Sequence, residues 1–319
     1  MPQVDKHHKR PLVQLEFNAS EEFETHALEE RAVIVLASYG CASIMLNDKA
    51  VNIIAPCALL LSYKDSIKLL ESDRFIARSF HFNPTFINSN LSFENLAKNE
   101  FTELEDKHDR EMMNLFLIRN DNYDGILDLP AGTYLRIFEW LSIIGTELYA
   151  QSDGRWTCRI RRYLLQTLYL LDDIFMSKKV NGNVKSKKAP VDIAMEYIHV
   201  NYPQSIKLGT LCDFVYTNRT TLNRNFKAKT GKTAMEYLAH YRIKIACEAL
   251  AQTNITLYEI AEAVGFKYDT YFIKQFSKRM SMTPTEYRYK MWDKSGRYQF
   301  VSREDPNVSV NVKGENNAN

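Results

Sequence analysis

Closely spaced cysteine pairs are missing from the sequence. Its five cysteines are scattered along 319 residues, and no two of them form a Cys-X-X-Cys motif. An odd, dispersed set argues against a disulfide framework and against a cysteine-ligated zinc site. We expect reduced thiols that act as small hydrophobic residues. They are Cys41, Cys57, Cys158, Cys212 and Cys247.

Long apolar runs are absent too. No stretch approaches the roughly 18 apolar residues of a membrane span, and the N-terminus MPQVDKHHKRP is basic and polar, unlike a secretory signal. We therefore expect a cytoplasmic protein. With 45% hydrophobic and 12% aromatic residues, the chain can bury a sizeable core, and its length favours two domains.

Charge is distributed unevenly. Residues 1–186 carry 21 Lys and Arg against 26 Asp and Glu, a net charge of −5, whereas residues 187–292 carry 16 against 9, a net charge of +7. This asymmetry suggests that only the C-terminal half meets a polyanion, although many basic faces are merely solvated.

From Leu12 to about Phe82 the sequence is typical of β structure. Short apolar runs such as RAVIVLAS, VNIIA and ALLLS follow one another closely, and Asn47-Asp48 is a hairpin signal. Strands this short and closely spaced predict a small sandwich or barrel.

After Pro84 the pattern becomes helical. Two amphipathic stripes joined by a turn at residues 152–154 predict an antiparallel helical hairpin. Both stripes could simply cover the sheet, or part of the surface within residues 131–176 could join two copies into a homodimer. The first stripe has Leu135, Phe138, Leu141, Ile144 and Leu148, and the second has Ile160, Tyr163, Leu164, Leu168, Leu171 and Phe175.

Composition sets the domain boundaries. Residues 177–190 have no periodicity, carry five lysines and end in Pro190, which predicts a linker. The pattern is helical from there to Trp292, and the polar residues 293–319 predict a disordered tail. We therefore expect an α+β chain, with one domain over residues 1–176 and an all-α domain over residues 191–292.

The C-terminal domain contains its own sequence twice. At an offset of 49, Leu208, Leu211, Cys212 and Val215 correspond to Leu257, Ile260, Ala261 and Val264. At an offset of 50, Leu222, Arg224, Phe226, Thr233, Glu236 and Tyr237 correspond to Phe272, Lys274, Phe276, Thr283, Glu286 and Tyr287. The offset therefore grows by one residue between the two helices of the second copy, where a turn can accommodate an insertion.

Each copy follows the helix-turn-helix plan, a short helix, a turn and a recognition helix with buried residues four apart. Asn218 is expected to cap the first recognition helix, Gly231 suits its C-terminus, and Asp269 could cap the second helix. A connecting helix over roughly Ala234–Ala251 would hold the two recognition helices about 34 Å apart on one face of DNA.

The second copy, IAEAVGFKYDTYFIKQFSKRMSMTPTEYR, resembles the signature of AraC/XylS-type transcription regulators. The first copy (TLNRNFKAKTG) and the connector (YRIKIACEAL) match the same family in order and spacing. Two departures are Ser281, where the family usually has Gly, and Tyr268, where a capping residue is common. The pattern I-A-x-x-x-G-F, Y-F, F, T-P-x-E-Y-R is present as Ile260, Ala261, Gly265, Phe266, Tyr271, Phe272, Phe276, Thr283, Pro284, Glu286, Tyr287 and Arg288.

The resemblance implies sequence-specific binding to double-stranded DNA. Arg224 suits guanine and Asn223 suits adenine, whereas Asp269 suits either a cytosine amino group or the helix cap. The expected base-facing residues are Thr220, Asn223 and Arg224 in the first recognition helix and Asp269, Thr270 and Lys274 in the second. Expected phosphate contacts, which position the protein without specifying sequence, are Lys227, Lys229, Lys232, Lys278 and Arg279.

For the N-terminal half, the resemblance implies a cupin-like β-barrel followed by helices, which senses a small-molecule effector and dimerises. Candidates for lining its pocket are Phe17, Tyr39, Tyr63 and Phe80, although ordinary core positions account for them better. A metal-binding cupin would need several histidines beside a carboxylate. His26 and His81 stand alone, so neither a metal nor a cofactor is predicted.

Three other classes of function would each require different features. A cupin-type enzyme tethered to DNA would need clustered metal ligands or a catalytic nucleophile with its partner residues, and the sequence has neither. A bifunctional DNA-repair methyltransferase would need clustered cysteines, which are also missing. A regulator without a ligand, controlled by its abundance, stays open. We predict a non-enzymatic transcription regulator, and the resemblance favours activation through contact with RNA polymerase.

Overall fold

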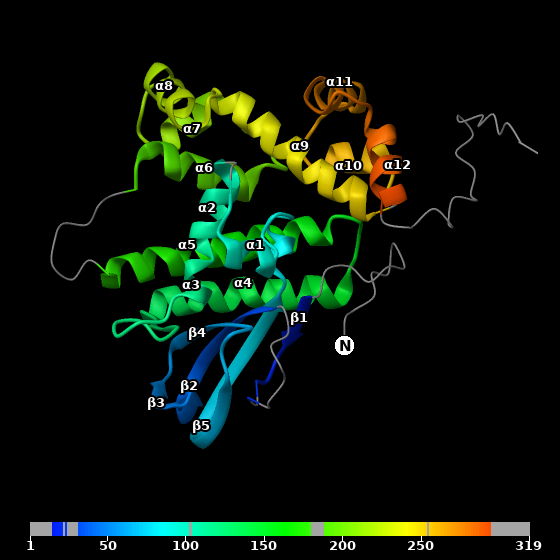
Figure 1. The fold of residues 1–319 in the computed structure, drawn as a ribbon. Helices are drawn as coiled ribbons and strands as arrows, with labels where there is room; N and C mark the ends of the chain where they lie inside the picture. The colour runs from blue at the N-terminus through cyan, green and yellow to red at the C-terminus, as the bar shows by residue number, and fades with distance from the viewer. Residues whose placement is uncertain are drawn as a thin grey trace, which may run out of the picture.

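The computed structural model of the protein describes residues 15–21, 23, 31–101, 104–179, 188–253 and 255–294. A β-sheet lies at one end of the molecule, and helices α4 (Ala131–Ala150) and α5 (Trp156–Lys179) cross one of its faces. A helical C-terminal region lies beyond them (Figure 1). Among the described residues, no helix combines the length and the apolar character that crossing a membrane requires.

The sheet is antiparallel, and the chain is of the mixed α+β class, as predicted. Its strand order is β1-β5-β2-β4-β6, with β3 paired to β2. Asn47 and Asp48 have φ values of 50° and 63°, as a tight type I′ hairpin requires, so the predicted hairpin is confirmed. The strands are β1 (Leu15–Asn18), β2 (Ala32–Leu46), β3 (Lys49–Ile54), β4 (Cys57–Ser62), β5 (Ile67–Phe82) and β6 (Ile126–Asp128).

The two longest strands, β2 and β5, curl the sheet. Register shifts interrupt their pairing around Tyr39 and again after Ser43, and such bulges bend a strand. Successive side chains of β2 point to opposite faces of the sheet and enter two cores: Ile34 faces the helices, and Val33 belongs to a second core on the other face. The described strands follow an open path rather than a closed ring, so the predicted cupin-like barrel is not confirmed.

The predicted helical hairpin is confirmed as α4 and α5, which cover the sheet. Most residues of the two stripes are buried, and Phe138 and Tyr163 are half-buried against the same core. Leu135 is 63% exposed, and Ile137, two positions later, takes the core position instead. Helix α5 continues to Lys179, so the first residues of the predicted linker are helical. Residues 180–187 of that linker lie outside the described residues.

Short elements connect the sheet to this hairpin and pack beside it. They are η1 (Pro84–Phe86), α1 (Phe93–Lys98), α2 (Leu104–Met112) and α3 (Asn114–Leu117). Their apolar residues join the core between the sheet and α5. Helix α2 thereby also comes within reach of the C-terminal region, which Lys244 contacts through an ion pair with Asp106 at 2.9 Å.

The C-terminal region is entirely helical and contains both predicted helix-turn-helix units. The connecting helix spans Ala234–Gln252, close to its predicted bounds, and the whole region shares one hydrophobic core. Residues 293 and 294 end the last helix, and the remainder of the predicted tail lies outside the described residues. The helices are α6 (Pro190–Asn201), α7 (Leu208–Phe214), α8 (Arg219–Thr230), α9 (Ala234–Gln252), α10 (Leu257–Ala263), α11 (Asp269–Met280) and α12 (Pro284–Lys294).

A buried ion pair helps to join the two halves of the molecule. Arg161 of α5 donates to Glu248 of α9 at 2.6 Å and to the carbonyl oxygen of Ile87 at 2.6 Å. Burial opposes the charge of Arg161, but the Glu248 carboxylate outweighs this effect and raises the pKa of Arg161. Val200 of α6 adds an apolar contact, because it belongs to the core formed by the sheet and α5.

Candidate nucleic-acid interface

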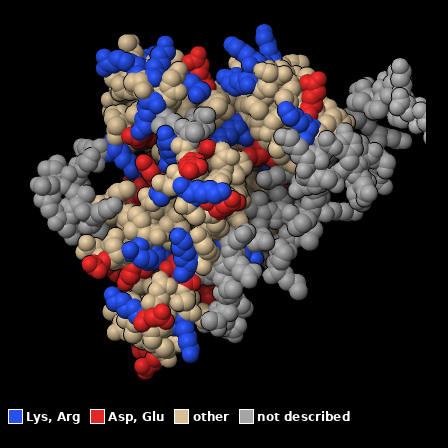
Figure 2. Space-filling model, viewed as in Figure 1, with Lys and Arg blue, Asp and Glu red and all other residues tan. Residues whose placement is uncertain are grey.

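Both recognition helices, α8 and α11, lie at the end of the molecule opposite the sheet, with α9 running between them (Figure 1). Lys and Arg side chains gather over this end (Figure 2). Leu222 and Phe226 of α8, and Phe272 and Phe276 of α11, are fully buried. Each helix is thus anchored by one face and leaves the opposite face exposed, as the sequence predicted.

The ends of α8 are formed as predicted. The side-chain oxygen of Asn218 accepts a hydrogen bond from the backbone N–H of Thr221 at 2.8 Å. Gly231 ends the helix with φ 71°, a left-handed conformation that glycine adopts without strain. These two residues determine where the exposed face of α8 begins and ends.

The start of α11 differs from the prediction by one position. Tyr268 is the N-cap and makes no side-chain capping bond, so the prediction that Asp269 is the cap was wrong. Asp269 is instead the first helical residue, and its carboxylate accepts from the backbone N–H of Thr270 at 2.6 Å. A negative charge in this first turn still interacts favourably with the helix dipole.

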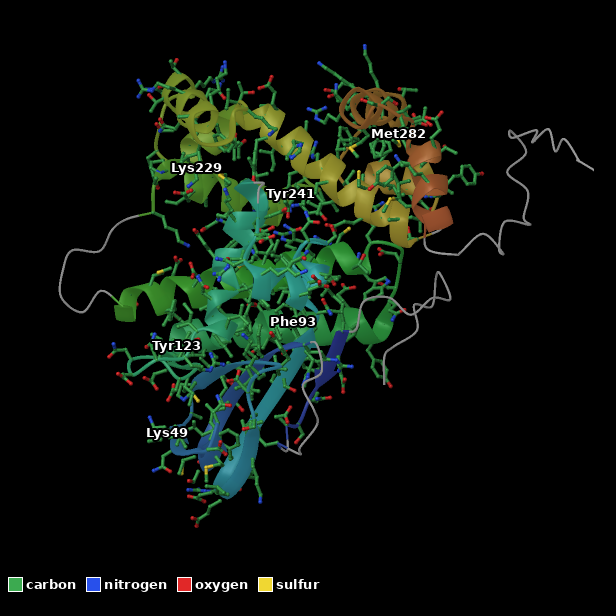
Figure 3. All side chains as sticks on the ribbon, in the orientation of Figure 1. Lys49, Phe93, Tyr123, Lys229, Tyr241 and Met282 are labelled. Atoms are coloured by element: carbon green, nitrogen blue, oxygen red, sulfur yellow. The ribbon has the colours of Figure 1, made fainter. Side chains whose placement is uncertain are left out.

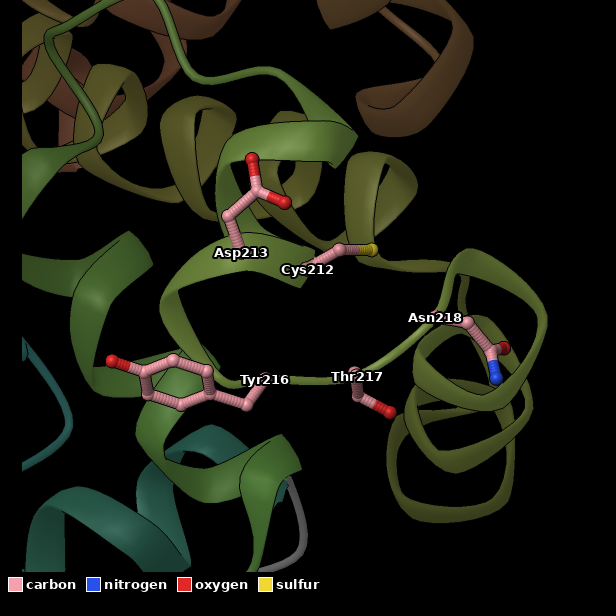
Figure 4. A pocket seen from close by; sticks show the side chains of 5 residues that line it. All are labelled: Cys212, Asp213, Tyr216, Thr217 and Asn218. Atoms are coloured by element: carbon pink, nitrogen blue, oxygen red, sulfur yellow. The ribbon is translucent and has the colours of Figure 1, made fainter.

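The turn of each unit requires a left-handed residue. Gly265 has φ 88°, and a Cβ there would lie 2.6 Å from the carbonyl oxygen of Tyr202. The equivalent position of the first unit holds Tyr216, with φ 52° and 97% exposure. Beside it lies a shallow open hollow lined by Cys212, Asp213, Tyr216, Thr217 and Asn218 (Figure 4).

The matched Thr and Glu of the internal repeat are capping residues. The backbone N–H of Thr233 donates to Glu236 at 2.8 Å, and that of Thr283 donates to Glu286 at 2.7 Å. Each pair therefore begins the helix that follows a recognition helix, α9 or α12. This part of the internal repeat therefore encodes the same helix cap in both units.

Comparison with known proteins matches residues 211–290 to the family model of a helix-turn-helix domain. The chain is 35% identical over 98 residues to the bifunctional transcriptional activator and DNA repair enzyme AdaA of Bacillus subtilis, which covers 31% of this chain and 46% of the relative. It is 33% identical over 98 residues to an AraC-like transcription regulator of Streptomyces lividans, covering 31% and 32%. The C-terminal domain is of the AraC type.

The similarity of the AraC-type domain extends to an operon regulatory protein. The chain is 32% identical over 123 residues to the xylose operon regulatory protein of Haemophilus influenzae, covering 38% of this chain and 32% of the relative. In each of these three alignments the chain spans less than half the length of the relative.

The expected base-facing residues of the AraC-type domain differ in their availability. Thr220 and Arg224 are exposed on α8, and Thr270 and Lys274 are exposed on α11. Asn223 is half-buried, and its side-chain oxygen accepts from the backbone N–H of Ala234 at 3.2 Å. A bidentate contact to adenine needs that oxygen, so this bond would have to break first.

The expected phosphate contacts differ in the same way. Lys227 and Lys278 are exposed, and Lys232 is half-buried beside the end of α8. Lys229 forms an ion pair with Asp192 of α6, and Arg279 donates to Gln275 within its own helix. Lys227, Lys232 and Lys278 can reach a phosphate directly, whereas Lys229 and Arg279 would first have to release Asp192 and Gln275.

The four aromatic pocket candidates do not meet in one place. Phe17 and Phe80 are neighbours on paired strands, and both pack between the sheet and the helices, Phe17 against Gly145. Tyr63 joins the same core through Phe93, with ring centroids 4.4 Å apart. Tyr39 is 54% exposed and lies apart from them. Three of the four therefore occupy core positions.

Sequence reasoning missed a cluster of His108, Asp109 and His199, whose possible ligand atoms all lie within 4.8 Å of one another. His81, by contrast, interacts with Ser79 at 3.0 Å, and His26 lies outside the described residues. Spacing along the chain gives no signal for this cluster, because His199 belongs to the AraC-type domain and the other two residues belong to α2.

Proposed function

We propose that the chain is a cytoplasmic, sequence-specific DNA-binding transcription regulator that acts as an activator. The supporting observation is the pair of helix-turn-helix units whose recognition helices both lie at one end of the molecule (Figure 1), each with one face buried and the other exposed. Such helices read base edges in successive major grooves of one duplex face. The similar proteins include a transcriptional activator and an operon regulatory protein.

Within this proposal, exposure and chemistry divide the contacts. Arg224 reads guanine through its two-pronged guanidinium, and Thr220, Thr270 and Lys274 contact further base edges. Asn223 contacts bases only after releasing Ala234, and Asp269 mainly stabilises the start of α11. The side chains assigned to phosphates are Lys227, Lys229, Lys232, Lys278 and Arg279.

We assign sensing and dimerisation to residues 1–176 and DNA binding to residues 191–292. The curled sheet, with a core on each face, is compatible with a cupin-like sensor of a small-molecule effector. A homodimer would use the outer face of residues 131–176, where Leu135 is 63% and Tyr149 is 77% exposed. As an activator, the bound protein would contact RNA polymerase.

The test is selection of bound sequences from a random duplex library with purified protein. Wild type should enrich one motif with two parts about one DNA turn apart. Arg224→Ala should lose preference at one base position of that motif. Arg74→Ala removes the same charge from β5, at the far end of the molecule, and should leave the motif unchanged. Enrichment of no motif by wild type would refute sequence-specific binding.

A further inference from the structure

Three side chains with metal-binding atoms meet where the N-terminal half packs against the AraC-type domain. His108 and Asp109 belong to α2 and His199 belongs to α6, so the cluster draws on both halves of the molecule. Tyr241 of α9 stacks on His199, with ring centroids 4.3 Å apart, in the region between α9 and the helices of the N-terminal half (Figure 3).

The two residues from α2 are positioned as ligands. Asp109 is 4% exposed, and one carboxylate oxygen accepts from the side-chain amide of Asn88 at 2.8 Å. Such a second partner orients a carboxylate ligand. The Nδ1 atom of His108 is buried and makes no hydrogen bond to any described residue; Asp109, at 3.7 Å, is too far away. A buried nitrogen without a partner is unfavourable.

His199 is held between two tyrosines. Its Nδ1 lies 2.9 Å from the hydroxyl of Tyr169, and its Nε2 lies 2.7 Å from the hydroxyl of Tyr237. Metals bind neutral imidazole, and a metal would replace one tyrosine while the other continues to orient the ring.

We propose that His108, Asp109 and His199 bind a divalent transition-metal ion of the zinc class. Two imidazoles and one carboxylate suit zinc, cobalt, nickel or ferrous iron, whereas magnesium and calcium prefer all-oxygen sites. Nearby Lys244 does not occupy the site, because its ammonium group is bound to Asp106 at 2.9 Å.

Binding would tie the two halves together. Ligand atoms at about 2.0–2.2 Å from a tetrahedral metal lie about 3.3–3.6 Å apart, and here they all lie within 4.8 Å of one another. An ion held by all three residues would therefore fix the position of α6 relative to α2. Helix α6 contacts recognition helix α8 through Asp192 and Lys229, so the ion would also alter how α8 is presented. This consequence, unlike the site itself, rests on the proposed DNA-binding function.

The site is tested by calorimetric titration of the full chain with Zn²⁺ after treatment with a chelator. We expect one ion per chain. Asp109→Asn, which keeps the shape of the side chain, and His108→Ala should each weaken binding at least about tenfold. His81→Asn removes a histidine outside the cluster and should bind as wild type does. Thermal melting without metal checks that the variants fold.

A second probe reports the ligands directly. Co²⁺ in a site with two imidazoles and one carboxylate should produce a visible absorption band that both variants lose and His81→Asn retains. Failure of wild type to bind either metal, or equal binding by wild type and His108→Ala, would overturn the site. These measurements contain no DNA, so their failure is distinguishable from failure of the proposed function.

The effect of the metal on DNA binding is measured separately, with the motif found by selection. Zn²⁺ should change the affinity of wild type for this DNA severalfold and leave that of His108→Ala unchanged. Stoichiometric Zn²⁺ binding with no change in DNA affinity would overturn the coupling between the site and α8.

Discussion

Arg224 and Lys227 are neighbouring exposed cations on α8, and their chemistry gives them different roles. The planar guanidinium of Arg224 matches two acceptors on one guanine, whereas the ammonium group of Lys227 is a point charge suited to a phosphate. Both were singled out from the sequence alone. The structure adds that both project from the face of α8 opposite buried Leu222 and Phe226.

Replacing these two residues should give two distinct binding defects. Arg224→Ala should remove about 1–3 kcal/mol of discrimination at one base position. Lys227→Ala should weaken binding about equally on every site variant and lower the salt slope by about 1. Titrations of single-base site variants at several salt concentrations separate the two. Identical behaviour of both proteins on all variants would contradict the division of contacts.

Glu21 should make the stability of the sheet sensitive to acid. Burial raises the pKa of this carboxyl, but nearby His81 and hydrogen bonds from Ser79 and from the N–H of Phe23 outweigh it and lower the pKa to about 2 from 4.5. Because the folded pKa is the lower one, this stabilisation is complete above about pH 4.5 and is lost as the pH falls towards 2.

Glu21→Gln should flatten this dependence. Between pH 6 and pH 2.5, the free energy of unfolding of wild type should fall by about 2 kcal/mol more than that of the variant. Urea denaturation at a series of pH values measures the difference. Parallel curves for the two proteins would show that Glu21 keeps an ordinary pKa in the folded state.

At the scale of elements, the turn of the second helix-turn-helix unit depends on one glycine. A Cβ on Gly265 would lie 2.6 Å from the carbonyl oxygen of Tyr202, whereas one on Gly231 would meet nothing within 4 Å. Both glycines have positive φ. Comparing alanine at the two positions therefore separates two contributions to the loss of stability: the steric clash of the new Cβ, and the strain of a left-handed backbone conformation.

Gly265→Ala should destabilise the protein by about 2 kcal/mol or more, and Gly231→Ala by about 1 kcal/mol. Thermal or denaturant unfolding of the two variants gives the comparison. Equal losses would mean that the Tyr202 backbone moves aside at little cost, and that only the left-handed conformation matters at position 265.

At the scale of the whole molecule, the two halves are joined by a buried charge pair. Arg161 and Glu248 are 8% and 9% exposed and lie 2.6 Å apart. Removing one partner leaves the other charge buried without compensation, whereas replacing both with apolar residues avoids that penalty. The pair therefore offers a direct measure of how the halves are coupled.

Arg161→Met should lower the free energy of unfolding by about 3–5 kcal/mol, and adding Glu248→Leu should restore most of the loss. Denaturant unfolding of wild type, single variant and double variant measures the three free energies of unfolding. If the double variant were as unstable as the single one, the loss of stability would come from packing or from the hydrogen bond to Ile87. It would then not come from burying the Glu248 carboxylate without a partner.

Local patterns gave correct predictions where the deciding interactions are local. The hairpin at Asn47-Asp48, the cap at Asn218 and the two helix-turn-helix units depend on residues a few positions apart. Errors were of two kinds. Asp269 was misplaced by one position because Tyr268 begins the helix without a capping side chain, and Leu135 was assigned to the core although Ile137 lies there.

The element types, the internal repeat and the exposed basic face could be predicted from local sequence, because periodicity and capping act over a few residues. Contacts between residues that are distant along the chain could not: Asn223 against Ala234, Arg161 against Glu248, and His199 beside His108. These contacts join residues that share no periodic pattern. Their formation depends on how whole helices pack, and that packing is decided by the shapes and volumes of cores assembled from the entire chain.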